Sequence, residues 1–162
     1  MIELQTPLSA EAIHSLQVGD RITLSGWIYC GRDAVLPKLV SGEVRVELQG
    51  AVIFHTAVSP AGVGPTSSNK LEIESSIAPL SAMGVKLHLG KGALHPETVR
   101  ALDQYGAVYA VIPPVTALLG EKTLEQELVA CPELGMEALY RLKADAFPAI
   151  IAAAHGRSIY DK

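Results

Sequence analysis

A short polar stretch, GVGPTSSNK at positions 62–70, holds the residues best suited to chemistry. Its glycines let backbone N–H groups approach a ligand, the start of a following helix adds a partial positive charge, and Lys70 adds a full one. Together these features suit a bound anion. The alternative is a turn at Gly64 followed by Thr66 and Ser67 as competing helix caps. The stretch does not match the phosphate loop GxxxxGK[ST], so it does not predict nucleotide binding.

Two further cations directly follow segments of strand character. GRD at 31–33 places Arg32 at a strand end, where a guanidinium can bind a carboxylate through two hydrogen bonds; the alternative is a surface pair between Arg32 and Asp33. GKG at 90–92 flanks Lys91 with glycines, so that backbone and ammonium can both approach a ligand; the alternative is a flexible connector. Ligands of α/β sheets tend to lie outside strand ends, and the simplest ligand for cations gathered there is a small di-acid.

Histidine and cysteine add little to this chemistry. Of the five histidines we retain only His55 as a site candidate, because it interrupts an apolar run just before the glycine-rich stretch. The two cysteines, Cys30 and Cys131, are far apart and form no CxxC motif, so they predict neither a zinc site nor a disulfide framework. An iron–sulfur cluster usually needs three or four thiolates, so this chain is not expected to hold one alone.

Periodicity predicts the elements that must position these residues. The first expected helix begins after Ser9 and ends at Gly19, and Pro79 is expected to break or kink a later one. We expect a turn at His155-Gly156. Helical spacing is found at 9–19, 71–84, 95–106 and 133–143, and strand patterns or buried apolar runs at 21–30, 43–48, 51–58, 85–90, 107–112, 147–154 and 157–160. The fold class expected is α/β with a mixed sheet, in a single domain over 1–162.

Composition excludes several classes of function. The chain has 162 residues, 49% of them hydrophobic, which is enough for one real core. A net charge of -4 without a Lys/Arg cluster argues against nucleic-acid binding. The apolar runs are too short to span a bilayer and the N-terminus lacks the pattern of a signal peptide, so we expect a cytoplasmic protein with no membrane partner.

Taken in order, four segments resemble one family. GDRITLSGWIYCGRDA, GVGPTSSNK, GKG and ELGMEALYRLKADAFPAII are similar to the β subunit, or C-terminal domain, of class I fumarases and L-tartrate dehydratases. The pattern there runs as GRDxAH, GPTTSxRM, GKG and an ELGMEA helix. The resemblance extends from about Leu16 to Tyr160 and implies a swivelling β/β/α domain.

The resemblance also implies partners and a cofactor. In that family a partner subunit carries a 4Fe-4S cluster, whose open iron acts as a Lewis acid on a leaving hydroxyl while a base removes a proton from the adjacent carbon. This chain itself is expected to bind no cofactor and no metal. The expected partners are a cluster-bearing α subunit, a small di-acid and, as an open alternative, a second copy of this chain.

Carried over by position, the resemblance assigns roles to the candidate residues. Arg32, beside Asp33, would clamp a substrate carboxylate, and Lys91 matches the lysine of GKG. Thr66 matches the first threonine of GPTTS, proposed to abstract the proton, and Ser67 matches the second, a substrate hydrogen-bonder. Gly64 and Lys70 complete the substrate-binding set in the same loop, with Lys70 at the arginine position of SxRM.

Several positions depart from the family pattern. Leu36 stands where a histidine is expected, and Lys70 replaces a bidentate arginine fork with a point charge. We therefore expect a hydro-lyase subunit acting on a hydroxy-di-acid such as malate or tartrate, or on a relative of one. The alternative is a catalytically altered paralogue that serves as a small-anion-binding or partner-binding domain.

Overall fold

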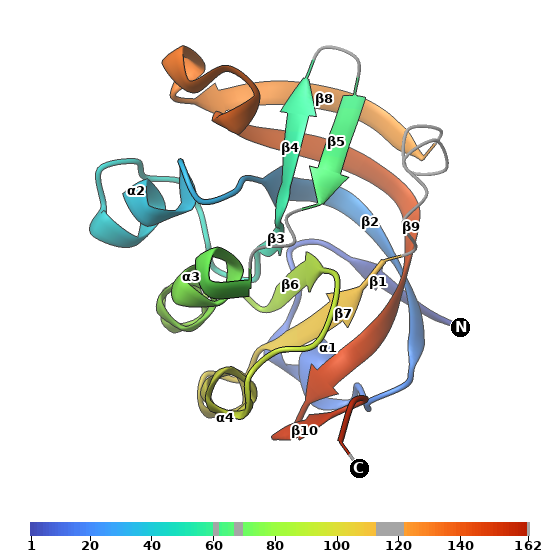
Figure 1. Cartoon of the computed structure of the whole chain (residues 1–162). Helices are drawn as coiled ribbons and strands as arrows, with labels where there is room; N and C mark the ends of the chain where they lie inside the picture. Colours follow the sequence, from blue (N-terminus) through green and yellow to red (C-terminus); the bar gives the residue numbers. More distant parts are fainter. Residues whose placement is uncertain (60–61, 67–69, 113–121, 162) are drawn as a thin grey trace.

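In the computed structural model, the described residues form two sheets and four α-helices (Figure 1). The structure describes residues 1–59, 62–66, 70–112 and 122–161, and only the backbone of 57–59, 62–66 and 70–73. The main sheet contains parallel and antiparallel pairs, so the expected α/β architecture with a mixed sheet is confirmed.

The helices and strands follow one another in an order that mixes both types. The helices are α1 (Ala10–His14), α2 (Leu36–Ser41), α3 (Lys70–Ala82), α4 (Pro96–Gln104) and the 3-10 helix η1 (Pro132–Glu137). The strands are β1 (Ile2–Gln5), β2 (Arg21–Cys30), β3 (Val52–Phe54), β4 (Thr56–Ser59), β5 (Gly62–Thr66), β6 (Leu87–Gly90), β7 (Val108–Val111), β8 (Thr123–Ala130), β9 (Leu139–Ala154) and β10 (Arg157–Ser158).

The main sheet closes on itself. Strands β2, β3, β6 and β7 are neighbours in that order and run parallel. The long strand β9 is antiparallel to both outer members of this group, because Ile150 of β9 pairs with Arg21 of β2 and with Val111 of β7. The five strands therefore form a closed ring, and the carboxyl ends of the four parallel strands share one edge.

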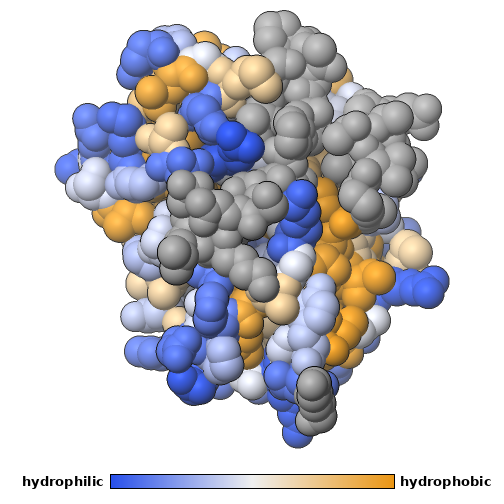
Figure 2. Space-filling view, viewed as in Figure 1, coloured by the Kyte–Doolittle hydropathy of each residue, from blue (hydrophilic) through white to orange (hydrophobic). Residues whose placement is uncertain are grey.

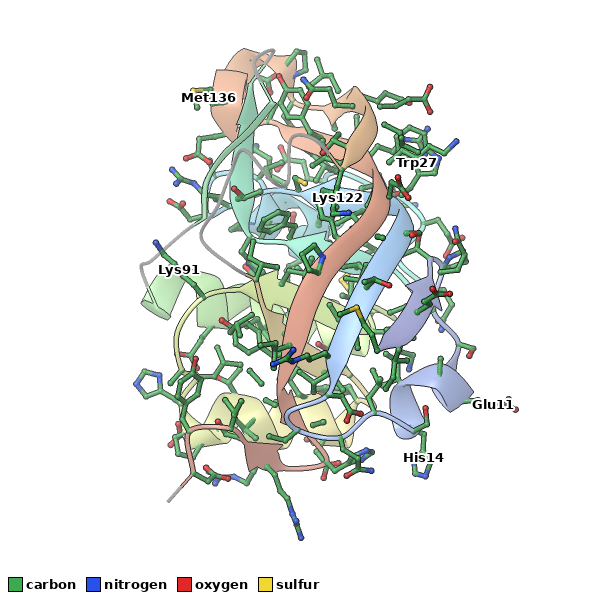
Figure 3. All side chains as sticks on the ribbon, turned by 90° about the vertical axis from the view of Figure 1, so that its right-hand side faces the viewer. Glu11, His14, Trp27, Lys91, Lys122 and Met136 are labelled. Atoms are coloured by element: carbon green, nitrogen blue, oxygen red, sulfur yellow. The ribbon has the colours of Figure 1, made fainter. Side chains whose placement is uncertain are left out.

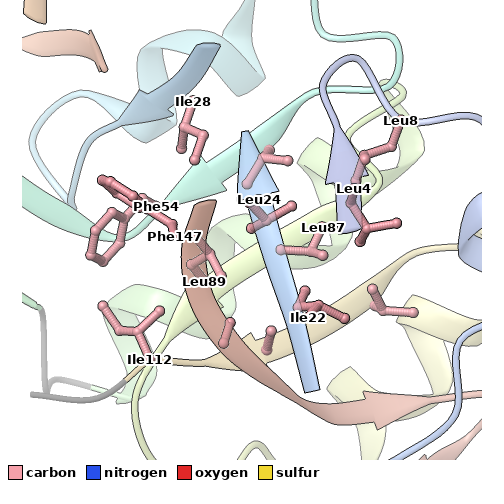
Figure 4. Packing of buried hydrophobic residues seen from close by; sticks show 14 of the residues in the cluster. Leu4, Leu8, Ile22, Leu24, Ile28, Phe54, Leu87, Leu89, Ile112 and Phe147 are labelled. Carbon is pink, nitrogen blue, oxygen red and sulfur yellow. The ribbon is translucent and has the colours of Figure 1, made fainter. Parts of the chain in front are cut away.

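The interior of this ring is the largest hydrophobic cluster of the described residues, shown close up in Figure 4. Phe54 of β3 and Phe147 of β9 are fully buried there. Burial of a side chain of this size contributes about 1.5–3 kcal/mol. This core holds the parallel strands at fixed spacing, and so fixes the positions of the loops that follow them.

A second layer covers the outer face of the parallel strands. Helices α2, α3 and α4 lie together on one side of the sheet (Figure 1). Ile53 packs with Leu36, Leu39 and Leu80 beneath α2 and α3, whereas its chain neighbours Val52 and Phe54 face the ring interior. Because β3 is buried on both faces, its sequence is a continuous apolar run rather than an alternating one.

Several predicted elements are confirmed. The first helix begins after Ser9 as predicted, and the Ser9 hydroxyl accepts a hydrogen bond from the Ala12 N–H at 3.1 Å, but the helix ends at His14 and not at Gly19. The segments predicted as strands at 21–30, 85–90 and 107–112 form β2, β6 and β7, and the helix predicted at 95–106 is α4. His155 and Gly156 form the turn between β9 and β10, with φ angles of 54° and 76°.

Two further local predictions are wrong, and a third, the break or kink at Pro79, is tested only as to the break. EVRVEL at 43–48 turns its alternate residues inward, with Val44 and Val46 partly buried and Leu48 buried, but it pairs with no strand of the described residues and stays irregular. ELGMEALYRLK is not one helix: Gly135 has non-helical angles, and from Leu139 the chain pairs with β2 and β8 as β9. Pro79 lies within α3 and does not end it. In the second case, strand partners on both sides outweigh the helical spacing of Leu134, Ala138 and Leu142.

No helix in the described part of the chain is long and apolar enough to cross a membrane.

Candidate functional site

The carboxyl ends of β2, β3 and β6 lie in one row of the sheet. Cys30, Phe54 and Leu89 are direct register partners across the three strands. One residue further on, the Gly31 N–H donates to the Phe54 carbonyl at 3.1 Å, and the His55 N–H donates to the Leu89 carbonyl at 3.0 Å. The strands thus stay in register up to the point where each of them ends.

This register brings together residues that are widely separated in the chain. Arg32 follows β2, His55 follows β3 and Lys91 follows β6, so all three lie at the same sheet edge with His55 on the middle strand. The prediction that Arg32 and Lys91 follow strand ends is therefore confirmed, and both strands end at one edge.

Close packing explains why each cation follows a glycine. A Cβ at Gly31 would lie 2.7 Å from Cγ1 of the buried Val35, and a Cβ at Gly90 would lie 3.0 Å from the hydroxyl oxygen of Tyr109. Gly31 has no room for a side chain, and a side chain at Gly90 would require Tyr109 to shift by a few tenths of an ångström. Glycine at these positions lets α2 and the Tyr109 ring pack closely against the strand ends. The residue after each glycine, Arg32 or Lys91, begins the loop that follows the strand.

Arg32 is paired with a carboxylate that the sequence did not single out as a site residue. Its Nε donates to both carboxylate oxygens of Glu137 in η1, at 3.0 and 3.2 Å, and its Nη2 also donates to Glu137. Both side chains are a little over a quarter exposed, whereas Asp33 is exposed. The structure shows that this guanidinium can hold a carboxylate through two nitrogens, the geometry expected for a di-acid.

The loop that carries Lys91 is held at both of its ends. The Tyr109 hydroxyl donates to the Gly92 carbonyl at 3.1 Å. The Glu74 carboxylate in α3 accepts hydrogen bonds from the His95 N–H at 2.8 Å, from His95 Nδ1 at 2.6 Å and from the Thr98 hydroxyl at 2.6 Å. These contacts fix the GKG loop between α3 and α4, so the loop is not the unrestrained connector of the alternative reading.

The titration of two of these groups fits their roles. Burial raises the pKa of Tyr109, so its hydroxyl stays a donor at neutral pH. Burial alone would raise the pKa of Glu74, but the hydrogen bonds from Thr98 and His95 lower it below its ordinary value. Glu74 is therefore a charged acceptor when it holds the start of α4.

Lys91 is exposed beyond this loop. The described residues give it no ion pair, in contrast to Arg32. Figure 3 shows Lys91 on the side of the molecule away from Glu11 and His14. Its ammonium is accessible to an anionic ligand.

The glycine-rich stretch reaches the same edge, as far as its backbone is described. Gly64 and Thr66 belong to β5, which pairs with β4, and Thr66 is the register partner of Thr56, the residue after His55. Lys70 is the first residue of α3. The Thr66 and Lys70 side chains and all of Ser67 lie outside the described parts. The predicted convergence of the Thr66 hydroxyl with the cations stays a prediction.

Two further residues are buried at or near this edge. His55, the one histidine retained from the sequence, is 1% exposed and its Nε2 lies 3.1 Å from Nδ1 of His88. Leu36, at the position where the resemblance expects a histidine, is also 1% exposed and packs with Leu39 and Ile53. Leu36 is a core residue here and presents no polar group to a ligand.

The described side chains do not fit an iron–sulfur cluster or another resident metal. Within residues 1–59, 62–66, 70–112 and 122–161, no three histidine, cysteine, aspartate or glutamate side chains gather closely enough to hold a metal. Cys30 is buried and burial raises its pKa, which disfavours the thiolate that a metal needs. We therefore derive no step that uses a metal bound by this chain.

Two cavities lie away from Arg32 and Lys91. One of about 560 Å³ opens at the amino ends of β6 and β7, between Lys86, Asp103, His14 and His155. Another of about 340 Å³ lies between Met1 and the facing parts of β2, β7 and β9. Figure 2 shows apolar surface over β7 and β9. The candidate site at the carboxyl edge is therefore defined by its residues.

Comparison with known proteins identifies the family. The family model described as "Fumarase C-terminus" matches residues 1–162. The chain is 30% identical over 172 residues to the L(+)-tartrate dehydratase subunit beta of Escherichia coli strain K12, covering 96% of this chain and 85% of that subunit. The chain belongs to the fumarase C-terminus family, so the resemblance found in the sequence is confirmed.

A second relative is a longer protein. The chain is 30% identical over 175 residues to a Geobacillus stearothermophilus protein named "Putative fumarate hydratase class I", covering 99% of this chain. It spans only 34% of that relative's length. A chain of this family therefore exists both as a subunit and as part of a larger polypeptide.

Proposed function

We propose that this chain is the β-type subunit of an iron–sulfur-dependent hydro-lyase that reversibly adds water to, or removes it from, a small hydroxy-di-acid of the malate or tartrate type. The single observation that carries this proposal is the position of Arg32 and Lys91 at one edge of the sheet. Arg32 follows β2 and Lys91 follows β6, and β3 lies between these two parallel strands. Membership in the fumarase C-terminus family supports it. The chain would act as one swivelling β/β/α domain in the cytoplasm.

The two cations would bind the two carboxylates of the substrate. Arg32 already holds a carboxylate through two nitrogens, and a substrate carboxylate would take the place of Glu137. Lys91 would bind the other carboxylate as an exposed point charge. Holding both ends of a di-acid fixes its orientation, which lowers the entropic part of the barrier to reaction.

The glycine-rich loop would supply the remaining groups. Thr66 would remove or return the proton on the carbon next to the leaving hydroxyl, and Ser67 would hydrogen-bond the substrate. A threonine hydroxyl is a poor base unless nearby cations lower its pKa, and Lys91 and Lys70 would provide that charge. Gly64 would let backbone N–H groups approach the substrate, and Asp33 would lie beside the bound carboxylate.

The partner would complete the enzyme. The E. coli relative is named a subunit beta, which supports a partner α subunit for this chain as well. Since the described residues here do not fit a metal, the 4Fe-4S cluster expected from the resemblance would belong to that partner. The part of this chain is then to bind and orient the di-acid and to handle a proton.

Two observations favour a second function, an anion-binding or partner-binding domain without catalysis. Arg32 is already matched by Glu137, and Leu36 is buried in the core. In a site that serves only a substrate, Arg32 would be expected to keep its guanidinium for that substrate, and position 36 would be expected to present a polar group. In this case the purified chain alone would bind small dicarboxylates with saturable heat in calorimetry, and no complex containing it would show turnover.

Reconstitution tests the proposal directly. The chain would be purified with any cluster-bearing protein that co-purifies from its source, and L-tartrate, L-malate and fumarate would be assayed for dehydration or hydration. We expect turnover that needs both chains and at least one of these substrates. A brown, cluster-loaded complex that turns over none of them, or the absence of any co-purifying partner, would contradict the proposed function.

A further inference from the structure

Three buried polar side chains form a hydrogen-bond chain that ends at the candidate site. Ser81 of α3, His88 of β6 and His55 after β3 are each at most 3% exposed. The Ser81 oxygen lies 2.9 Å from His88 Nε2, and His88 Nδ1 lies 3.1 Å from His55 Nε2. The chain therefore runs from the helix layer to the sheet edge that carries Arg32 and Lys91.

The first member fixes where the protons lie. The Ser81 hydroxyl donates to the Ile77 carbonyl at 2.7 Å, which uses its only proton. Its oxygen then accepts from His88 Nε2–H, so neutral His88 has a bare Nδ1 that accepts from His55 Nε2–H. A neutral imidazole has one N–H, and the Nδ1 of His55 is consequently an unprotonated acceptor.

That acceptor is buried and has no hydrogen-bond partner among the described residues. Most buried polar atoms in native proteins are paired, and an exception calls for an explanation such as a water or a functional group. Burial lowers the pKa of His55 to about 4, and burial together with the charge of His55 also lowers that of His88. His55 Nδ1 is therefore unprotonated at neutral pH.

The position of His55 relates this lone pair to the proposed ligand. Its register neighbours on both sides are Gly31 and Gly90, which have no side chains. Of these three adjacent residues, His55 alone can present a side chain between the loops that carry Arg32 and Lys91. A neutral lone pair repels carboxylate oxygens and attracts a hydroxyl proton.

We propose that His55 Nδ1 accepts a hydrogen bond from a hydroxyl of the di-acid, which makes His55 a specificity-determining residue for hydroxylated over unhydroxylated di-acids. This inference rests on the proposed function, because it takes a di-acid held at the same edge. Ser81 and His88 act through His55 as positioning residues that keep its Nδ1 unprotonated.

The first test uses nitrogen NMR of the full chain labelled with 15N at histidine and arginine. The ligand series is L-tartrate, L-malate and succinate, which share a four-carbon di-acid and differ in their hydroxyls. The His55→Phe variant identifies the His55 signals by their loss. We expect an unprotonated Nδ1 whose signal moves with L-tartrate or L-malate and not with succinate.

The possible results separate the two proposals. If the Arg32 Nε signal moves with all three acids and His55 Nδ1 with none, this inference fails and the proposed site stands. If no acid moves either signal, both fail. A protonated Nδ1 would show that His55 is in the other tautomer and would overturn the inference. An Nδ1 that is already hydrogen-bonded without ligand, and whose signal no ligand changes, would indicate a buried water and would overturn it too.

The second test measures affinity by calorimetry. The wild type should bind the better hydroxylated acid about 2- to 10-fold more tightly than succinate, the range of one neutral hydrogen bond. His55→Phe should lose this preference while still binding succinate. His14→Phe, an exposed histidine at the opposite edge, is the matched control and should keep it.

Two more variants keep the test decisive if His55→Phe does not fold. His55→Asn places an amide oxygen near the position of Nδ1 and should restore part of the preference. Ser81→Ala removes the group that fixes the tautomer and should reduce the preference without removing the ring. A full preference in a folded His55→Phe, or no preference in the wild type, would overturn the inference.

Discussion

The two edges of the parallel sheet differ, because one has a cavity and the other gathers cations. The amino edge has the cavity of about 560 Å³, but Glu11 and Asp103 balance Lys86 there. The carboxyl edge gathers Arg32, Lys91 and a buried His55 Nδ1 that has no hydrogen-bond partner among the described residues. The cavity at the amino edge therefore does not by itself identify a site for an anionic ligand.

Substitution of one lysine at each edge gives the largest expected contrast. In the proposed two-subunit enzyme, Lys91→Ala should lower kcat/KM by about 10²–10³-fold, because a charge proposed to stabilise the reacting di-acid is lost. Lys86→Ala at the amino edge should change it by less than about twofold. Steady-state assays and circular dichroism of both folded variants would check this. Equal activity of the two variants would remove the distinction between the edges.

The buried histidine chain should make stability depend on pH. His55 has a pKa of about 4 when folded and 6.5 as its ordinary value, so the unfolded chain binds more protons between them. Stability from this group is therefore complete above about pH 6.5 and is lost as the pH falls towards about 4. Between about pH 7 and pH 4 the wild type should lose about 3 kcal/mol more than His55→Phe in urea unfolding. Parallel stability curves would contradict the burial of a neutral ring.

Glycines at the two edges should respond differently to an added methyl group. Gly31→Ala should cost about 1–3 kcal/mol, because its Cβ would lie 2.7 Å from the buried Val35 side chain. Gly106→Ala at the amino edge has open space, with Lys86 Nζ 3.7 Å away, but its φ of +65° costs a side chain about 1 kcal/mol. Urea unfolding of both variants measures the difference. A larger loss of unfolding free energy in Gly106→Ala than in Gly31→Ala would show that α2 moves to make room for the added methyl group at the carboxyl edge.

The smallest expected effect concerns the carboxylate that competes for Arg32. Glu137→Gln removes the charge that a substrate carboxylate must displace, so dicarboxylate affinity should rise by about two- to fivefold. The matched control is Glu127→Gln, which removes the partner of Arg141 at 2.9 Å and should leave the affinity unchanged. Calorimetry of the two variants decides whether Glu137 occupies the ligand position or only supports the fold.

The sequence by itself determined which residues follow strand ends. Alternation in 21–30 and apolar runs at 85–90 and 107–112 are local patterns, and they predicted β2, β6 and β7 correctly. The motifs GRD and GKG follow two of these strands, so the cations at Arg32 and Lys91 and their preference for an anion were readable without coordinates. The resemblance carried by the motifs also indicated the family.

Only the tertiary structure decided how those strand ends are combined and what they contact. Arg32 and Glu137 are 105 residues apart in sequence, and His55 and His88 are 33 apart, so no local pattern reports either pair. The strand β9 replaced part of a predicted helix because β2 and β8 supply hydrogen-bond partners on both of its sides. Such pairings form only when distant segments share a core, and their energy outweighs local spacing.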